Sequence, residues 1–243
     1  MGIESVSDII AFGAKELNID LPPDAGAAFE TYCDFLNKRN ESVNLTAIHG
    51  AGDTARLHFL DSLALLLMTN FQNAKVIDIG SGAGFPGIPL KIAAPSLELT
   101  VLDATEKRVN FLTELCALIN LKASCIHARA EEAAHLHAFR EQFDIVVSRA
   151  VAGLSILCEL CLPYVKTGGL FIAMKGIGSD SEINEAKIAL DILGAETMDC
   201  VDYNIPGTDI MHRAVLIKKV AVTPDKYPRR FASIKKKPLQ PSN

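Results

Sequence analysis

The sequence lacks the features of several protein classes. No apolar run approaches the roughly 20 residues that span a bilayer, and the nearest candidate, Leu63–Met68, is far too short. The first ten residues are acidic and lack a basic segment followed by an apolar one, so we expect no secretory signal. The six cysteines are scattered and do not suggest the disulfide framework of a small secreted protein. These absences lead us to expect a cytoplasmic protein.

Two of the cysteines form a C-x-x-C pattern over Cys158–Cys161. The pattern lies in an apolar run of helical character, and no second pair accompanies it. A structural zinc site needs four ligands. We therefore interpret both side chains as buried thiols and expect no metal site.

A positive net charge is also absent, because 24 Lys and Arg stand against 29 Asp and Glu, which gives −5. That balance alone argues against a general nucleic-acid binder. The charge is unevenly spread, however, since the segment from residue 218 to the end holds eight Lys and Arg and one acid. This segment carries +7 and the remainder −12. A basic tail on an acidic body is a candidate contact for a polyanion.

What the chain does contain is a glycine-rich stretch, V-I-D-I-G-S-G-A-G-F-P-G, over Val76–Gly87. The β-branched residues at its start predict a short buried strand over Lys75–Ile79. A helix is predicted over Pro86–Ala94, with proline in its first turn. A strand, a glycine loop and a helix N-terminus in this order form a nucleotide-type site.

Three ligand classes could use such a loop, and the spacing separates them. A phosphate-binding P-loop ends in Gly-Lys-Ser/Thr, whereas Gly87 is followed by Ile and Pro. A dinucleotide fingerprint that starts at Gly80 needs glycine where Phe85 stands. The pattern present is D-x-G-x-G-x-G over residues 78–84, which resembles motif I of S-adenosylmethionine (SAM) methyltransferases. The alternative is a glycine-rich turn without a ligand.

Strands and helices alternate regularly from this stretch onward. Strands are predicted over residues 75–79, 97–103, 123–128, 143–148, 169–175, 195–204 and 211–219. Helices are predicted over 7–17, 24–38, 86–94, 106–120, 131–140, 154–164 and 181–193, with a further helix that Asp53 or Thr54 caps and that runs to 68.

This order predicts an α/β, Rossmann-like fold of the SAM-dependent methyltransferase type. We expect a mostly parallel seven-stranded sheet, one antiparallel strand from a closing hairpin, and an N-terminal helical cap. Three segments are expected to form one structural unit: the cap over residues 1–70, the methyltransferase domain over 71–220 and the basic tail over 221–243.

Ligands of an open α/β sheet bind outside the carboxyl ends of the strands, so the residues there are the candidates. Asp103 ends an apolar strand and suits two ribose hydroxyls, the alternative being an ordinary surface acid. Glu131 could face an adenine, or could merely begin a helix. Arg149 could bind a phosphate or a purine edge, or form a surface ion pair.

Several cationic residues have two interpretations each. Lys107 and Arg108 open a helix, where the dipole disfavours cations, which mildly favours a polyanion near them. Lys175 closes a strand and could contact phosphate or simply be a solvated strand end. His58 and Asp61 share a helix face and could be an acid–base pair or a structural hydrogen bond.

Six segments occur in an order that resembles one known family. They are H-F-L-D-S (58–62), I-D-I-G-S-G-A-G-F-P-G-I-P (77–89), K-R-V-x-F-L (107–112), A-R-A-E (128–131), S-R-A-V-A (148–152) and T-P-x-K-Y-P-R-R (223–230). Together they resemble the ribosomal RNA small subunit methyltransferase G family, also called the glucose-inhibited division protein B family. The resemblance runs from about residue 44 to the C-terminus, and its most specific parts are G-F-P-G-I-P and S-R-A-V-A.

The resemblance implies methylation of N7 of one guanine in 16S rRNA, at the position called 527. SAM would be the cofactor, S-adenosylhomocysteine the product, and the small ribosomal subunit the partner of a monomeric chain. With the glycine motif, the candidate SAM-binding residues are Asp78, Gly80, Gly82, Phe85, Asp103, Ala104, Ala130, Glu131 and Arg149. Arg149 is also a candidate for positioning the guanine. The candidate RNA-binding residues are His58, Lys107, Arg108, Lys175, Lys226, Arg229, Arg230, Lys235, Lys236 and Lys237.

The chain departs from the family in places. Leu57 stands where a basic residue often precedes the histidine, and Ala104 stands where serine is usual, so a contact at Ala104 would use the backbone. The tail carries Asp225 and the run 231–234 where relatives often have basic and Gly or Pro residues.

The implied reaction needs no general base, because guanine N7 has a lone pair and no proton. We therefore expect catalysis to come from alignment of the nucleophile, the methyl group and the sulfur. Two alternatives remain: a methyltransferase of the same fold that acts on a small molecule, and a non-enzymatic ribosome-assembly or RNA-binding protein. A nicotinamide oxidoreductase is disfavoured by Phe85.

Overall fold

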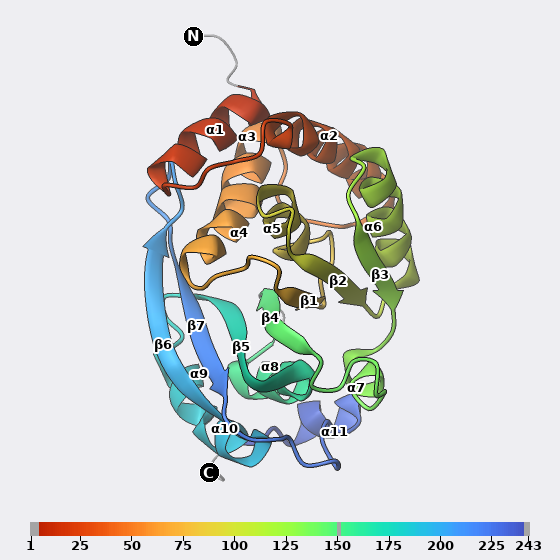
Figure 1. Ribbon diagram of the computed structural model, residues 1–243, viewed down its shortest axis with the longest axis vertical. Coiled ribbons are helices and arrows are strands. Elements are labelled where there is room, and N and C mark those ends of the chain that lie inside the picture. Colours follow the sequence, from red (N-terminus) through yellow and green to blue (C-terminus); the bar gives the residue numbers. More distant parts are fainter. Residues whose placement is uncertain (1–4, 150–151, 241–243) are drawn as a thin grey trace.

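The computed structural model describes residues 5–149 and 152–240. They form one seven-stranded sheet with helices around it (Figure 1). The strand order is β3-β2-β1-β4-β5-β7-β6. Strand β7 is antiparallel to both β5 and β6, and the other neighbouring strands are parallel to each other. The strands are β1 (Lys75–Ile79), β2 (Glu98–Asp103), β3 (Ala123–His127), β4 (Phe143–Arg149), β5 (Val165–Gly176), β6 (Ala195–Asn204) and β7 (Met211–Lys219).

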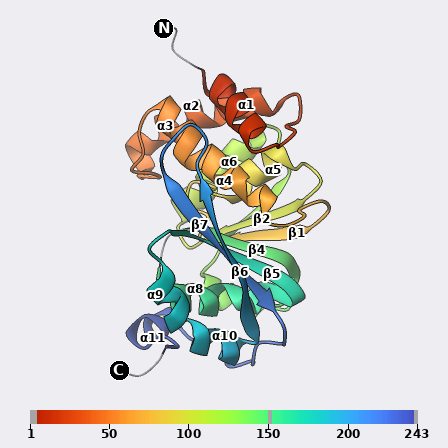
Figure 2. The same ribbon diagram turned by 90° about the vertical axis from the view of Figure 1, so that its left-hand side faces the viewer.

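Helices cover both faces of the sheet (Figure 2). One face carries α1 (Val6–Glu16), α2 (Ala25–Val43), α3 (Ala51–Thr54), α4 (Asp61–Leu63), α5 (Gly87–Ala93) and α6 (Glu106–Leu118). The other carries α7 (Ala130–Ala133), α8 (Leu154–Cys161), α9 (Asp180–Glu185), α10 (Lys187–Leu193) and α11 (Phe231–Lys236). This arrangement confirms the predicted Rossmann-like fold, because parallel strands need helical crossovers that bury both faces.

The cap and the sheet share one hydrophobic core. A single buried cluster contains Ile10, Phe29 and Phe59 from the cap together with Val76 and Leu99 from the sheet. The opposite face has its own cluster, in which Cys158 and Cys161 are fully buried as expected. The shared core supports one structural unit, while the boundaries proposed at residues 70 and 220 stay a prediction.

The segment before the sheet differs from its prediction. The helix begins at Ala51 after Gly50, whose φ is 90°, so neither Asp53 nor Thr54 is its cap. Its middle part, Ala55–Leu60, is a π-helix, and a short 3₁₀ stretch follows over Ala64–Leu67. π-turns are frequent at functional sites, and this one carries His58.

The basic tail is folded against the body. Arg229 makes a paired contact with the fully buried Glu159, at 2.8 and 2.6 Å. Arg140 donates hydrogen bonds to the carbonyls of Thr223 and Tyr227. The helix α7 is shorter than the helix predicted over 131–140, and Arg140 lies beyond its end, where its side chain contacts the tail. The sequence did not indicate α11, whose Ile234 is fully buried.

None of the helices in the described ranges is long and apolar enough to cross a membrane.

Candidate functional site

The glycine loop leaves no room for side chains at two positions. Gly84 has φ of 103°, and a Cβ there would lie 2.7 Å from the hydroxyl of Tyr32. That hydroxyl donates a hydrogen bond to the carbonyl of Ala83, so it cannot easily move away. A Cβ on Gly87 would lie 2.9 Å from the carboxylate of Asp78. The glycines therefore allow the loop to turn closely over the end of β1.

Two buried carboxylates accept hydrogen bonds from main-chain N–H groups in and beside this loop. Asp78 accepts a hydrogen bond from the N–H of Gly87 at 2.8 Å, which ties β1 to the start of α5. Asp103 accepts from the N–H of Gly82 at 3.0 Å and from the N–H of Thr105 at 2.8 Å. The loop is thus fixed between the carboxyl ends of β1 and β2.

The end of β1 and the loop after it hold two buried side-chain oxygens, Asp78 Oδ1 and Ser81 Oγ. Neither has a hydrogen-bond partner among the described residues. Burial raises the pKa of Asp78 to about 7. A buried acceptor of this kind is normally satisfied by a ligand or water. The cationic amino group of SAM suits the acid, and the oxygens of Asp103 have lone pairs left for ribose hydroxyls. The donor set therefore fits SAM.

The structure places the other predicted SAM residues after β2 and β3. Ala104 follows β2 and is exposed, and the N–H of Ala128 donates to the carbonyl of Asp103 at 3.2 Å. Ala130 begins α7 and accepts from the hydroxyl of Tyr164 at 2.6 Å. Glu131 is half-buried beside a cavity of about 850 Å³ that the basic tail also lines.

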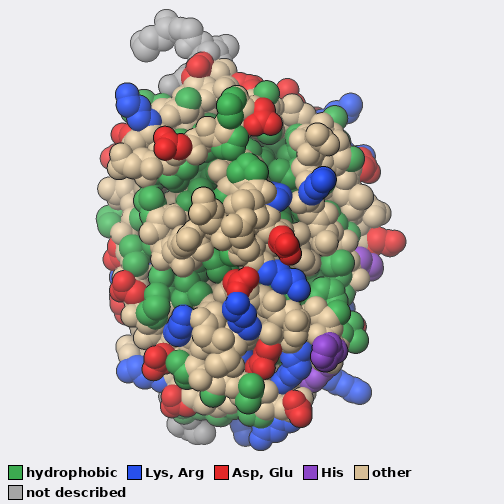
Figure 3. Space-filling view, viewed as in Figure 1, with side chains coloured by type: hydrophobic (Ala, Val, Ile, Leu, Met, Phe, Trp, Pro, Cys, Tyr) green, Lys and Arg blue, Asp and Glu red, His purple; other side chains and the backbone are tan. Residues whose placement is uncertain are grey.

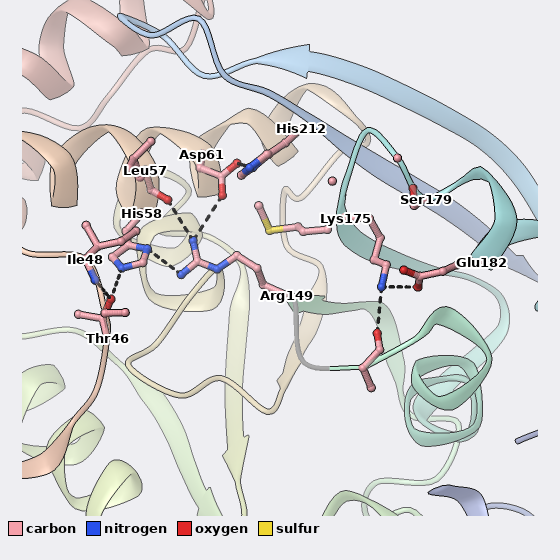
Figure 4. A pocket seen from close by; sticks show the side chains of 15 residues that line it. Thr46, Ile48, Leu57, His58, Asp61, Arg149, Lys175, Ser179, Glu182 and His212 are labelled. Atoms are coloured by element: carbon pink, nitrogen blue, oxygen red, sulfur yellow. Dashed lines mark hydrogen bonds and ion pairs between the residues drawn. The ribbon is translucent and has the colours of Figure 1, made fainter. Parts of the chain in front are cut away.

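Arg149, at the end of β4, is the centre of a group that we call the arginine cluster: Thr46, His58, Asp61, Arg149 and His212 (Figure 4). Arg149 Nη2 donates to His58 Nδ1 at 2.9 Å, and Nη1 lies 3.4 Å from Asp61 Oδ2. His58 must then donate through Nε2, which lies 2.7 Å from Thr46 Oγ1. His212 Nδ1 donates to Asp61 Oδ1 at 2.8 Å.

The pKa values of the two histidines of the arginine cluster are shifted in opposite directions. Burial, reinforced by the neighbouring Arg149, lowers the pKa of His58 to about 3. The hydrogen bond to Asp61 raises the pKa of His212. His58 is therefore neutral at physiological pH. His58 and Asp61 lie on one helical segment, and each contacts Arg149. The acid–base pair stays a prediction.

Arg149 joins the glycine loop to a cavity of about 920 Å³. Its guanidinium lies 4.7 Å from the centroid of the Phe85 ring, and His58 stacks on the same ring at 4.3 Å. The cavity is lined by the arginine cluster, by the 46–48 segment, by the end of β5 over 174–176, and by Gly178, Ser179 and Glu182. Arg149 and His58 both line the cavity and contact Phe85, so they connect the predicted cofactor loop with the cavity.

The predicted RNA-binding cations fall into bound and exposed groups. Arg108 lies 3.6 Å from Asp103, Arg229 is held by Glu159, and Lys175 lies 2.6 Å from Glu182. The exposed cations are Lys107, Lys226, Arg230, Lys235, Lys236 and Lys237. Figure 3 shows Lys and Arg side chains over the lower half of the face drawn, where α7 and α11 lie in Figure 1.

The sequence does not predict several residues of this site. No pattern in it indicates Thr46, Tyr203 or His212, and Asp61 is indicated only together with His58. Tyr203 donates to Asp61 Oδ1 at 2.9 Å from a position 142 residues away. No local pattern indicates such a contact, because the folded sheet alone brings β6 and β7 beside the cap. Among residues 5–149 and 152–240, no group of His, Cys, Asp and Glu could hold a metal ion.

Comparisons with known proteins agree with this geometry. The family model described as rRNA small subunit methyltransferase G matches residues 26–209. The ribosomal RNA small subunit methyltransferase G of Alkaliphilus oremlandii is 42% identical over 97% of this chain and 99% of its own length. That of Acetivibrio thermocellus is 44% identical over 93% of this chain and 94% of its own.

Two solved structures are similar in fold only. A putative O-methyltransferase from Klebsiella pneumoniae has a TM-score of 0.56 at 16% identity, covering 90% of this chain and 98% of its own. M. jannaschii TYW2, solved in complex with AdoMet, has a TM-score of 0.52 at 15% identity, covering 66% and 75%. The family model and the relatives together show that this chain belongs to the rRNA small subunit methyltransferase G family.

Proposed function

We propose that this protein transfers the methyl group of SAM to N7 of a guanine in 16S rRNA. The observation that carries the proposal is the position of Arg149. Its side chain contacts Phe85 of the glycine loop and lines the cavity of about 920 Å³. A cofactor on the loop and a base in the cavity would therefore meet beside one guanidinium group.

The proposed residue roles follow from these positions. Asp78, Gly80, Gly82 and Phe85 hold the amino-acid part of SAM. The ribose and adenine are held by Asp103, Ala104, Ala130 and Glu131. Arg149 positions the guanine, because a planar guanidinium can stack on a base or donate to its edge.

SAM supplies an electrophilic methyl group, and guanine N7 supplies the electron pair that forms the new bond. The purine gains the positive charge that the sulfur loses. A free cation beside the base would oppose this transfer. Asp61 lies 3.4 Å from Arg149, is fully buried and offsets the charge of that arginine. His58 adds no further charge, because its pKa is lowered to about 3.

The exposed cations of the tail and of α6 are proposed to hold rRNA phosphates outside the cavity. Arg230, Lys235, Lys236 and Lys237 are exposed on or beside α11, which is itself anchored by the buried Ile234. Phosphate contacts of this kind provide affinity that falls as salt rises. Arg229 already has a buried carboxylate partner, so we assign it a positioning role within the protein.

The proposal is tested with 16S rRNA and small ribosomal subunits from a strain that lacks this methyltransferase. Purified protein and tritiated SAM should transfer label to one guanine, which borohydride and aniline cleavage then locate. Transfer should fall steeply between 50 and 200 mM salt, by about tenfold or more. Label on a small molecule alone, or binding of RNA without transfer, would contradict the proposal.

A cytoplasmic monomer is the form we propose for the active protein. The small ribosomal subunit is a cytoplasmic partner in bacteria. Sedimentation of the purified protein, alone and with SAM, tests the oligomeric state.

A further inference from the structure

The cavity of about 920 Å³ has a second polar end, away from the arginine cluster. We call it the lysine end and define it by Lys175, Ser179 and Glu182. Figure 4 shows these three residues together on one side of Arg149, with His58 and Thr46 on the other. All three line the cavity.

Ser179 is the first observation that indicates a ligand at the lysine end. Its side chain is buried at 4% exposure, and its hydroxyl has no hydrogen-bond partner among the described residues. An unpaired buried hydroxyl destabilises the folded state, so such groups usually bind something. The cavity beside it is the place where a partner would lie.

Lys175 and Glu182 provide further hydrogen-bonding capacity. The ammonium group of Lys175 lies 2.6 Å from Glu182 Oε2 and donates to the carbonyl of Ala152 at 2.9 Å. An ammonium has three protons, so one remains. Glu182 Oε2 also accepts from the N–H of Leu154, at 2.9 Å. Its Oε1 takes part in none of the hydrogen bonds of residues 5–149 and 152–240.

This combination selects a neutral polar group. The carboxylate of Glu182 already offsets the charge of Lys175 and would repel a phosphate. The cavity lining at this end, Gly176, Gly178 and Ser179, offers no aromatic ring for a base to stack on. A hydroxyl that both donates and accepts would match the Ser179 hydroxyl, the free ammonium proton and the free carboxylate oxygen.

We infer that the lysine end binds a ribose of the rRNA strand through its 2′-hydroxyl, while the base lies at the arginine cluster. The inference rests on the proposed function, since it assumes an RNA substrate. The cavity volume lies near the upper end for ligand pockets and has room for a base and its sugar. The lysine end would then distinguish RNA from DNA, because only RNA carries that hydroxyl.

The first test compares Ser179→Ala with Ser181→Ala, a matched change at an exposed serine of α9. Ser179→Ala should raise the KM for 16S rRNA about fivefold or more, while the Kd for SAM changes less than about twofold. Its Tm should equal or exceed that of the wild type, because an unpaired hydroxyl has been removed. An unchanged KM, or a lower Tm with a proportional loss of transfer, would overturn the inference.

The second test changes the RNA. Ligated 16S rRNA is prepared in which the target nucleotide and its two neighbours carry 2′-deoxyribose in turn. One of these substitutions should raise the KM of the wild type about fivefold, with little further effect in Ser179→Ala. Equal effects in the wild type and in Ser179→Ala, or no effect at any position, would refute ribose binding at the lysine end and leave the proposed function intact. Failure of the wild type on all-ribose rRNA would instead refute the proposed function.

Discussion

The glycine loop and the arginine cluster are both organised around a fully buried aspartate, but in different ways. Asp78 is hydrogen-bonded to a main-chain N–H nine residues further along the chain. Asp61 receives hydrogen bonds from the side chains of Tyr203 and His212, and Arg149 lies within 3.4 Å. The first aspartate shapes backbone within one strand–loop–helix unit, whereas the second gathers side chains from distant segments.

The two regions should therefore be sensitive to different kinds of substitution. The loop depends on backbone conformation and on space, so added atoms should damage it. The arginine cluster depends on charge and on hydrogen-bond geometry, so isosteric changes should damage it. Four predictions test this contrast.

The largest effect is expected from Asp61→Asn, which removes the charge while keeping the volume. Arg149 would remain half-buried without its carboxylate partner, which typically costs about 3 kcal/mol of unfolding free energy. We expect kcat/KM for rRNA to fall at least about 100-fold, measured by methyl transfer and urea unfolding. Asp202→Asn, at an exposed ion pair on β6, is the control and should leave both quantities nearly unchanged. A kcat/KM within threefold of wild type would remove the arginine cluster from the mechanism.

Gly84→Ala should break the glycine loop through space alone. The new Cβ would lie within 3 Å of Tyr32, Ile88 and Leu112, at a φ of 103°. We expect a loss of about 2 to 3 kcal/mol of unfolding free energy and much weaker SAM binding in calorimetry. Gly168→Ala has a similar φ of 85° but meets nothing within 4 Å. It should cost only about 1 kcal/mol and leave SAM binding intact, and equal losses in both variants would show that crowding is unimportant.

A comparison of His212→Gln with Tyr203→Phe sharpens the role of Asp61. Both side chains donate to the same oxygen of Asp61, but only His212 lines the cavity. We expect His212→Gln to raise the KM for rRNA about tenfold, with SAM affinity unchanged. Tyr203→Phe should mainly lower the Tm. Identical kinetic effects would mean that His212 only supports Asp61.

The smallest effect concerns the pH dependence of stability. The pKa of Asp78 is raised to about 7 from an ordinary value near 4, so the folded state holds a proton that the unfolded state releases. Its contribution to stability is therefore present below pH 4 and lost as pH rises to 7. Asp78→Asn should flatten that part of the urea-unfolding profile. The pKa of His58 is lowered to about 3, so this residue gives the opposite slope of unfolding free energy against pH. It does so in the wild type and in Asp78→Asn alike, and the difference between the two profiles therefore reports Asp78 alone. The same slope in both would contradict the raised pKa.

Much of the fold could be predicted because its signals are local. The strands β6 and β7 have the predicted bounds, since apolar alternation and the Pro206-Gly207 turn define a hairpin. The cap helix at Ala51 was less predictable. Its first residue follows Gly50 in a left-handed conformation, whereas Asp53 and Thr54 are the better capping residues by type. The helix α11 could not be predicted, because it forms around the single buried Ile234.

The candidate site divides in the same way. The positions of Asp78, Gly82, Phe85 and Asp103 at two strand ends and in the loop could be predicted, because glycine spacing and strand ends are local patterns. Their contacts with SAM stay predictions. The candidate RNA-binding Lys and Arg residues are evident from the sequence, but which of them are exposed could not be predicted. Lys175 and Arg229 have buried or half-buried partners, Glu182 and Glu159, which lie seven and seventy residues away.

The seven strands, the glycine loop over β1 and the family follow from local sequence patterns. Each depends on neighbours in the chain, where side-chain period and backbone freedom act directly. Three features follow only from the folded chain: His58 is neutral, Asp61 contacts three side chains, and the Ser179 hydroxyl is unpaired beside a cavity. The burial of a side chain and the charges around it depend on every segment that packs against it, so no single stretch of sequence determines them.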